Sequence, residues 1–279
     1  MIKDTEYMEV YVKLIHFFMF SLFLFATTTK PMHRALKFGL AFLPTVTVSV
    51  AKAGAGLYCN YWLKKDPKKL SPEEFSPDFK KFVHKECKAV GIKDAEDIHI
   101  LPGCDDGASS MGSNLIYIGR YAKKFRYDDA LSIIASGSGD QAGALKDLNK
   151  LRCTCQHEAN HVKNKDHQRY ILAGVAVPSA TYVLATRLDK SFINRHCTTL
   201  QKYVRAGIKG TMLGAVNFGL LTLYMRHREQ QADNGVQDTK EILQAGIDDS
   251  QTNPDEFDLF HPSPRTRVKK FEKRLAKLN

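Results

Sequence analysis

The chain has 279 residues, of which 43% are hydrophobic and 25% are charged, and its mean hydropathy is −0.31. These values are typical of a folded globular protein, and they exclude both whole-chain disorder and a chain made mainly of membrane-spanning helices. Lys and Arg outnumber Asp and Glu by 41 to 30, which gives a formal net charge of +11. This charge is compatible with anionic lipid, with nucleic acid, or with a basic soluble surface only.

Two hydrophobic segments lie near the N-terminus. Residues 14–26 read LIHFFMFSLFLFA, and residues 38–50 read FGLAFLPTVTVSV with Pro44 inside them. Acidic residues precede the first segment and no typical cleavage site follows it, so we interpret it as an uncleaved anchor and not as a secretory signal. Each segment alone is shorter than the roughly 20 residues of a spanning helix, so flanking residues must extend it if it is to span a membrane. The sequence therefore predicts a membrane anchor or a membrane hairpin over residues 1–62, and hence an integral or anchored membrane protein.

A charged, proline-containing stretch after Trp62 marks the expected start of a second domain, residues 63–279. The stretch begins with a basic cluster: Lys64, Lys65, Lys68 and Lys69. Lysines directly beside a hydrophobic segment are typical of a surface that faces anionic lipid headgroups. No basic groove with interleaved aromatic residues is evident elsewhere, so we expect membrane lipid as a partner and no nucleic acid.

The second domain is predicted to be mainly helical. Residues 98–101 and 115–118 are short aliphatic runs on either side of a Gly- and Ser-rich loop, which indicates two strands. Helical periodicity follows over 127–136 and 144–166. Two charge-free apolar stretches come next, and they are either additional membrane helices or buried helices of the domain: 170–186 and 211–225. The predicted fold class is α+β, mainly helical with a small β-sheet, preceded by hydrophobic membrane segments.

The six cysteines are too few and too scattered for a disulfide scaffold, which favours a reducing compartment. Cys153 and Cys155 form a C-x-C pair that lacks the spacing of a zinc knuckle, and no second pair accompanies it. We therefore expect both to be small residues packed within a helix core.

The chemically most informative segment is HEANH, which comprises His157, Glu158, Ala159, Asn160 and His161. Two histidines at positions i and i+4 of a helix share one face, so both imidazoles can bind one Zn²⁺ ion. A carboxylate next to the first histidine can take a proton from water activated by zinc and pass it to the leaving amine. The segment therefore predicts a hydrolytic site with one zinc ion per chain.

A hydrolytic zinc site keeps three protein ligands, so a third ligand is needed. His167 gives the spacing H-E-x-x-H-x-x-G-x-x-H of a metzincin, with Asn164 at the glycine position. Asn tolerates a positive φ better than most residues, so this replacement does not exclude the metzincin interpretation. Glu229, in the segment REQQAD, is the rival candidate.

Three motifs in this order, HEANHVKNKDH, REQQAD and HPSPRTRV, resemble one family of zinc metallopeptidases. That family includes the HtpX heat-shock protease, the CAAX prenyl endopeptidase and the mitochondrial Oma (overlapping with m-AAA) metalloendopeptidases. The resemblance covers residues 98–275. It implies a gluzincin-like zinc metalloprotease domain and a membrane-associated metalloendopeptidase that cleaves polypeptides, with a suggested role in the quality control of membrane proteins.

The resemblance also assigns roles to individual residues. It makes His157, His161 and Glu229 the zinc ligands, and Glu158 the general base and acid. Asp233, one helical turn after Glu229, becomes the acceptor for the spare N–H of a ligand histidine.

Two residues of the third motif receive roles from the same resemblance. His261 is expected to donate a hydrogen bond to the oxyanion of the tetrahedral intermediate. Arg267 is expected to hold the C-terminal segment beside the helices of the active site.

The resemblance further implies an edge strand that binds an extended peptide by β-augmentation: Leu115, Ile116, Tyr117 and Ile118. The chain departs from the family pattern in three places. ASSMGSN stands before this strand in place of an Asn-Ala-Phe-like stretch, Asn160 occupies a position where glycine is usual, and residues 137–145 resemble an insertion.

A second interpretation comes from another functional class. The chain could be a non-catalytic, basic membrane-binding or adaptor protein in which the histidines form a structural or vestigial metal site. The net charge of +11 and the lysines after Trp62 favour this alternative.

Overall fold

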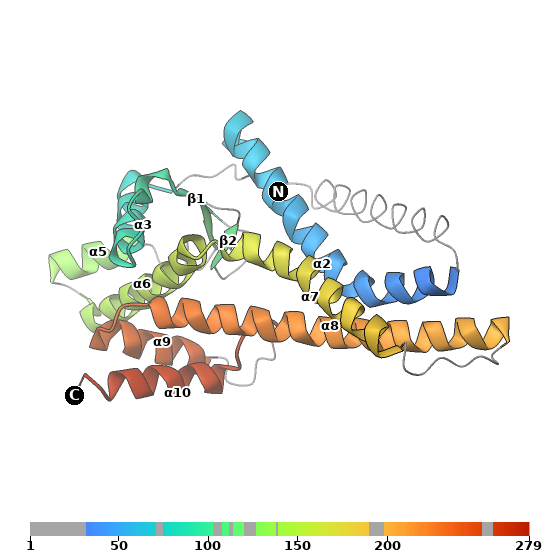
Figure 1. Ribbon diagram of the computed structural model, residues 1–279. Coiled ribbons are helices and arrows are strands. Elements are labelled where there is room, and N and C mark those ends of the chain that lie inside the picture. Colours follow the sequence, from blue (N-terminus) through green and yellow to red (C-terminus); the bar gives the residue numbers. More distant parts are fainter. Residues whose placement is uncertain are drawn as a thin grey trace. The chain divides into compact units, whose positions relative to one another are not determined.

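The computed structural model describes most of the chain after the N-terminal segment (Figure 1). The described residues are 32–70, 75–102, 108–111, 114–119, 127–137, 139–189, 198–252 and 259–278. Over these residues the chain is mostly helical with a small three-stranded sheet, which confirms the coarse fold class. The first predicted hydrophobic segment, residues 14–26, lies outside the described residues.

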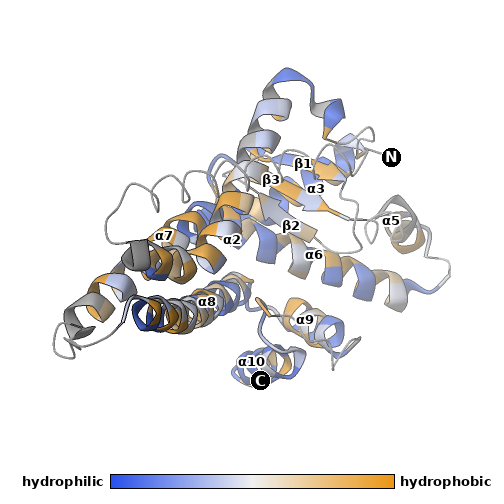
Figure 2. Cartoon of the chain, turned by 90° about the vertical axis from the view of Figure 1, so that its right-hand side faces the viewer, coloured by the Kyte–Doolittle hydropathy of each residue, from blue (hydrophilic) through white to orange (hydrophobic). Residues whose placement is uncertain are grey.

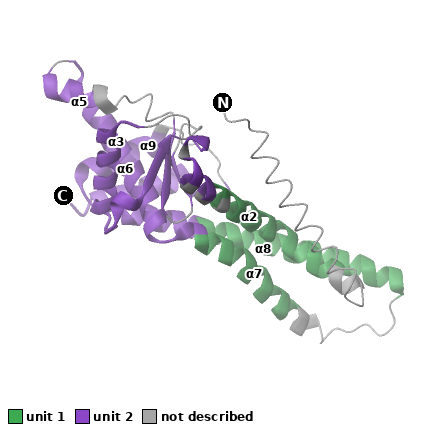
Figure 3. Ribbon diagram, turned by 90° about the horizontal axis from the view of Figure 1, so that it is seen from above, with its two compact units in different colours: residues 1–58, 168–225 green, residues 59–167, 226–279 purple. Residues whose placement is uncertain are grey.

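The chain divides into two compact units, each built from two separate stretches of sequence (Figure 3). The first unit contains residues 1–58 and 168–225, and the second contains 59–167 and 226–279. The first boundary lies close to the predicted one at residue 62. The later stretch of unit 1 contains the two apolar stretches 170–186 and 211–225, and it groups with the N-terminal helix and not with the residues that precede and follow it in sequence.

Parts of three long helices form the described portion of the first unit. These helices are α2 (Met32–Lys65), α7 (Asp166–Asp189) and α8 (Thr199–Gly235). Pro44 lies inside α2 and has no N–H, so the carbonyl of Leu40 lacks its usual helical donor. Gly214 of α8 lies directly against that carbonyl, since a Cβ at this position would stand 2.5 Å from the Leu40 oxygen. The absence of a side chain at Gly214 therefore permits the close approach of α8 to α2.

One buried amide joins all three helices of this unit. Asn217 of α8 donates a hydrogen bond to the Ala41 carbonyl of α2 at 2.8 Å, and it accepts one from the Thr181 hydroxyl of α7. Phe38 and Phe42 of α2 add ring contacts with Tyr182 of α7. The helices of this unit are thus held together by close contacts at small residues, by aromatic contacts and by the hydrogen bonds of the neutral Asn217 amide.

Large apolar side chains lie on the outside of the same helices. The exposed ones are Leu172, Val175, Val183 and Leu184 on α7, and Leu200, Val204, Ile208, Met212, Val216, Leu220 and Leu223 on α8. Hydrophobic residues are visible along α2 and α7 in Figure 2, whereas α10 is largely hydrophilic. Among the described residues, two helices are long and apolar enough to cross a membrane: Leu36–Leu63 within α2, and Thr199–Gly235, which is α8.

The sheet of the second unit has the strand order β1-β3-β2. Its strands are β1 (His99–Pro102), β2 (Ala108–Met111) and β3 (Leu115–Ile118), and β3 pairs parallel with β1 and antiparallel with β2. The prediction that Leu115, Ile116, Tyr117 and Ile118 form an edge strand is therefore wrong, because β3 carries a partner on both sides. The edges of the described sheet are β1 and β2. Strand β2 was missed because ASSM shows no alternation of apolar and polar residues.

The second unit also contains several described helices and two short 3₁₀ turns. They are η1 (Pro67–Lys69), α3 (Pro77–Ala89), η2 (Ala95–Asp97), α5 (Tyr127–Ser136), α6 (Gln141–Lys163), α9 (Lys240–Thr252) and α10 (Pro264–Leu275). Helix α5 has the predicted bounds. The single helix predicted over 144–166 is wrong at its end, because α6 stops at Lys163 and α7 starts at Asp166.

Helix α6 carries HEANH and lies between two hydrophobic cores. Cys155 packs in a core with α3 and the sheet, whereas Cys153, on the other side of the helix, packs with α9 and α10. Both are buried free thiols, so the prediction that they are packing residues is confirmed. A helix fixed on two sides is a rigid support for the polar residues on its remaining face.

Candidate metal centre

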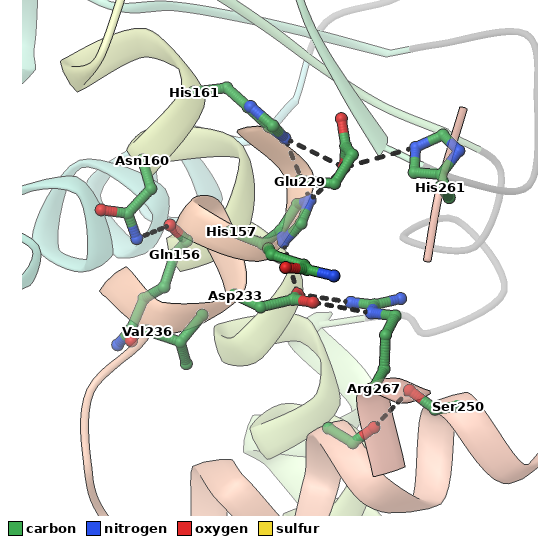
Figure 4. Close-up of polar contacts among 12 residues, drawn as sticks. Gln156, His157, Asn160, His161, Glu229, Asp233, Val236, Ser250, His261 and Arg267 are labelled. Carbon is green, nitrogen blue, oxygen red and sulfur yellow. Dashed lines mark hydrogen bonds and ion pairs between the residues drawn. The ribbon is translucent and has the colours of Figure 1, made fainter. Parts of the chain in front are cut away.

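Three side chains from two helices converge on one point in the second unit. His157 and His161 lie one turn apart on α6, and Glu229 comes from α8 (Figure 4). Glu229 Oε2 lies 3.2 Å from His157 Nε2 and 3.3 Å from His161 Nε2, and the two Nε2 atoms are 3.1 Å apart. Among the described residues, this is the group of His, Cys and acidic side chains that could hold a metal ion.

The spacing of these atoms fits a tetrahedral zinc site. Zinc bonds of about 2.0–2.2 Å at tetrahedral angles place neighbouring ligand atoms roughly 3.3–3.5 Å apart. The observed separations of 3.1–3.3 Å lie at or slightly below the lower end of that range. Two imidazoles and one carboxylate also form a donor set that suits zinc and leaves a fourth position for water.

Each ligand histidine is oriented by a carboxylate, and each carboxylate is held by an arginine. His157 Nδ1–H donates to Asp233 Oδ1 at 2.9 Å. Arg267 of α10 donates from Nη2 to the same oxygen at 2.9 Å and from Nε to Oδ2 at 3.1 Å. In the neutral imidazole, Nδ1 carries the proton for this hydrogen bond, so Nε2 of His157 is the atom whose lone pair faces the cluster.

His161 has an equivalent pair of partners that the sequence analysis did not identify. Its Nδ1–H donates to Asp166 Oδ2 at 2.8 Å, and Arg228 Nε donates to Asp166 Oδ1 at 2.6 Å. Asp166 lies beyond the end of α6, and Arg228 directly precedes Glu229. The available sequence signals were an acidic residue five positions after His161 and an arginine directly before Glu229, and such charged residues are too common to be specific.

Burial and charge act in opposite directions on the two histidines. Burial lowers the pKa of His157, but hydrogen bonds to Asp233 and Glu229 outweigh it and raise the pKa from 6.5 to about 10. Burial likewise opposes the hydrogen bonds of His161 to Asp166 and Glu229, which raise its pKa from 6.5 to about 9. Carboxylates that stabilise an imidazolium also stabilise a divalent cation at the same place. The site is therefore electrostatically suited to a metal ion.

The two predicted catalytic residues lie at the cluster. Glu158 is buried on α6 next to His157, and its charge contributes to the raised pKa of that histidine. His261 Nε2 is 3.4 Å from Glu229 Oε2, and its side chain is 52% exposed. Figure 4 shows His261 across Glu229 from His161, and its exposed side chain makes this the solvent-facing side of the cluster.

The rival third ligand, His167, is not part of this group. The metzincin spacing requires a turn with positive φ at Asn164, but Asn164 caps α6 with φ −82°. The positive φ of 54° falls instead on Lys165. The turn places Asp166, and not His167, against His161.

Asn160, which stands where the family pattern has glycine, is accommodated by a glycine elsewhere. It is buried, and its Nδ2 donates to the Gln156 carbonyl at 2.8 Å. Gly235 faces it, since a Cβ there would stand 2.2 Å from the Asn160 side-chain oxygen. The glycine at the end of α8, which has no side chain, thus leaves the space that the larger Asn160 on α6 occupies.

Helix α10 is held against the end of α8 by three basic residues. Besides Arg267, Lys270 donates to the Gln230 carbonyl at 2.6 Å and Arg274 to the Asp233 carbonyl at 2.6 Å. Asp233 is therefore fixed through both its side chain and its backbone. Only Arg267 was expected from the sequence; the contacts of Lys270 and Arg274 follow from their position on the same face of α10.

Comparison of the chain with protein-family models found no match, and comparisons with curated proteins and with solved structures found none either. The geometry of the candidate metal centre and the three sequence motifs therefore carry the functional argument.

Proposed function

We propose that the chain is a membrane-associated zinc metalloendopeptidase of the gluzincin type that its three motifs resemble. The observation that carries this proposal is the convergence of His157, His161 and Glu229, with both histidines oriented by buried carboxylates. A site that only binds a metal for stability usually closes all four positions with protein ligands, whereas a hydrolytic site keeps one open.

The roles of the chain's residues follow from their positions. Zinc, when bound, supplies Lewis acidity that lowers the pKa of water to about 7. Glu158 takes the proton of the attacking water and delivers it to the leaving nitrogen. His261, on the solvent-facing side of the cluster, donates a hydrogen bond to the carbonyl oxygen as negative charge develops there. Asp233 and Arg267 keep His157 in the tautomer that binds the metal.

A peptide substrate would add to β2. Within the described sheet, β2 has β3 on one side only, and β2 packs against α6. An extended peptide on its other side would gain backbone hydrogen bonds close to the helix that carries HEANH. This assignment replaces the predicted edge strand, residues 115–118, with residues 108–111.

The proposal places the first unit in a membrane. Many of its exposed side chains on α7 and α8 are large and apolar, although Lys202, Arg205 and Lys209 near the start of α8 are exposed as well, whereas its interior contains Asn217, Ser49, Thr45 and glycines. Small and neutral polar residues between helices, with large apolar residues outside, are typical of helices packed in lipid. In water the same outer surface would be an aggregation hazard.

Hydrolysis of casein by the purified full chain tests the proposal. Activity that disappears with a chelator, returns with Zn²⁺ and is absent from Glu158→Gln supports it. A wild-type chain that binds zinc but cleaves nothing would contradict peptidase activity and favour the adaptor interpretation. The Glu158→Gln chain must retain zinc, because Glu158 is not among the metal ligands.

A further inference from the structure

The mechanism proposed above gives an explicit role to the first carboxylate–arginine pair, Asp233 and Arg267, but not to the second pair, Asp166 and Arg228. We infer that these two residues form a positioning relay that sets the metal affinity of His161. The inference rests on the proposed function for the identity of the metal, but it does not depend on peptide hydrolysis.

The hydrogen bonds leave the Asp166 carboxylate no freedom to rotate. Its Oδ2 accepts from His161 Nδ1 at 2.8 Å, while Oδ1 accepts from Arg228 Nε at 2.6 Å and also from Arg228 Nη2. The side chains of Asp166 and Arg228 are only 1% and 7% exposed. A buried, doubly held carboxylate fixes both the ring plane and the tautomer of the histidine, and it leaves Nε2 as the atom that can bind a metal.

The relay also connects the helices that supply the ligands. His161 is on α6, Asp166 is the first residue of α7, and Arg228 precedes Glu229 on α8. The helix that provides the third ligand therefore also holds the residue that orients the second. Any shift of α8 relative to the start of α7 would move Glu229 and loosen His161 together.

A second buried pair in the same unit provides a matched control. Glu86 of α3 is 2% exposed and accepts from Arg152 Nε at 3.2 Å and from Gln156 Nε2 at 2.6 Å. It resembles Asp166 in burial and in its arginine partner, but it contacts no ligand histidine. Glu86→Gln should therefore lower stability without changing zinc affinity per folded chain.

The test measures Zn²⁺ affinity by chelator competition and the visible spectrum of the Co²⁺-loaded form. The full chain is purified in detergent as wild type, Asp166→Asn, Arg228→Lys, the double variant and Glu86→Gln. If Asp166 positions His161, Asp166→Asn should weaken Zn²⁺ binding by about 10- to 100-fold and alter the Co²⁺ spectrum. Arg228→Lys keeps the positive charge but loses the guanidinium group that donates two hydrogen bonds to Asp166. It should therefore weaken Zn²⁺ binding less than Asp166→Asn does. The double variant should be no worse than Asp166→Asn, because the two residues act as one unit.

Wild-type Zn²⁺ affinity and an unchanged Co²⁺ spectrum in both single variants would overturn the relay, even if their melting temperatures fall. Should Asp166→Asn fail to fold, Arg228→Lys alone decides between these outcomes. A loss of affinity in Glu86→Gln equal to that in Asp166→Asn would also contradict the inference, since it would show a general effect of buried charge. Absence of peptidase activity in a wild type that binds zinc would leave the relay standing and reject only the proposed function.

Discussion

The two units of the chain bury different kinds of polar group. In the first unit the buried polar side chains are mainly neutral, such as Asn217, Ser49 and Thr222, and large apolar residues face outward. In the second unit the buried polar groups include several charged or titratable side chains gathered around one point: Glu158, His161, Asp166, Arg228, Glu229 and Asp233. Neutral polar groups suit helices that pack against each other in lipid, whereas an excess of carboxylates around two histidines suits a divalent cation. The comparison supports the proposal that the first unit anchors the chain and that the second unit carries the chemistry.

The largest expected effect is loss of the metal in Glu229→Ala. This variant removes one of three ligands, so zinc content and hydrolysis should both disappear. His167→Ala is the matched control and should keep one zinc per chain, because His167 lies outside the ligand group. Elemental analysis of the purified variants decides the point, and zinc that is lost from the His167 variant but kept in the Glu229 variant would reverse the ligand assignment.

The next largest effect is expected in Glu158→Gln. Amide nitrogen cannot accept the proton of the attacking water, so kcat should fall by about 10²- to 10⁴-fold or more while zinc is retained. Steady-state cleavage of casein with parallel zinc analysis provides the measurement. A variant that has lost its zinc would show that Glu158 supports the metal and is not the proton carrier.

The pH dependence of stability should have opposite signs with and without zinc. In the metal-free chain the pKa values of His157 and His161 are raised from 6.5 to about 10 and about 9. The folded state therefore holds more protons than the unfolded state across this window. The free energy of unfolding should be highest below about pH 6.5 and fall as the pH rises toward 9–10.

Zinc needs neutral imidazoles, so its contribution to stability should instead rise with pH over the same window. Thermal unfolding in detergent at pH 6.5 and pH 9, with chelator and with excess Zn²⁺, measures both slopes. Parallel slopes in the two series would indicate that zinc does not bind at these histidines.

The smallest expected effect concerns the first unit. Asn217→Ala removes the hydrogen bonds to Ala41 and Thr181, and it should destabilise the helix bundle by roughly 0.5–2 kcal/mol without changing zinc affinity. Thr222→Ala is the control, because the buried Thr222 hydroxyl has no hydrogen-bond partner in the described part of the chain. Removing it should be neutral or stabilising. Unfolding in detergent measures both variants, and a reduced zinc affinity in Asn217→Ala would break the separation of roles between the units.

Local patterns predicted the parts of the structure that depend on neighbouring residues. The bounds of α5, the strands β1 and β3, and the shared face of His157 and His161 all follow from periodicity. The order of the strands does not, because which strand lies at an edge depends on contacts between distant segments. For this reason residues 115–118 were assigned to the edge although β3 is central.

The partners of the ligands show the same limit. The role of Asp233 was implied by the family resemblance, and its position one helical turn after Glu229 places it on the same helical face. Asp166 reaches His161 only because the chain turns at Lys165 with φ 54°. No spacing rule encodes that turn. Local patterns also could not show that the first unit combines two distant stretches of sequence, because only tertiary packing brings α2 beside α7 and α8.

X-ray absorption spectroscopy at the zinc edge of the purified full chain tests the central claim most directly. The proposed function predicts one zinc per chain, bound by two imidazole nitrogens and oxygen ligands at about 2.0–2.2 Å. Sulfur ligands at about 2.3 Å, three imidazoles, or a folded chain without zinc would contradict the assignment of His157, His161 and Glu229 as the metal centre.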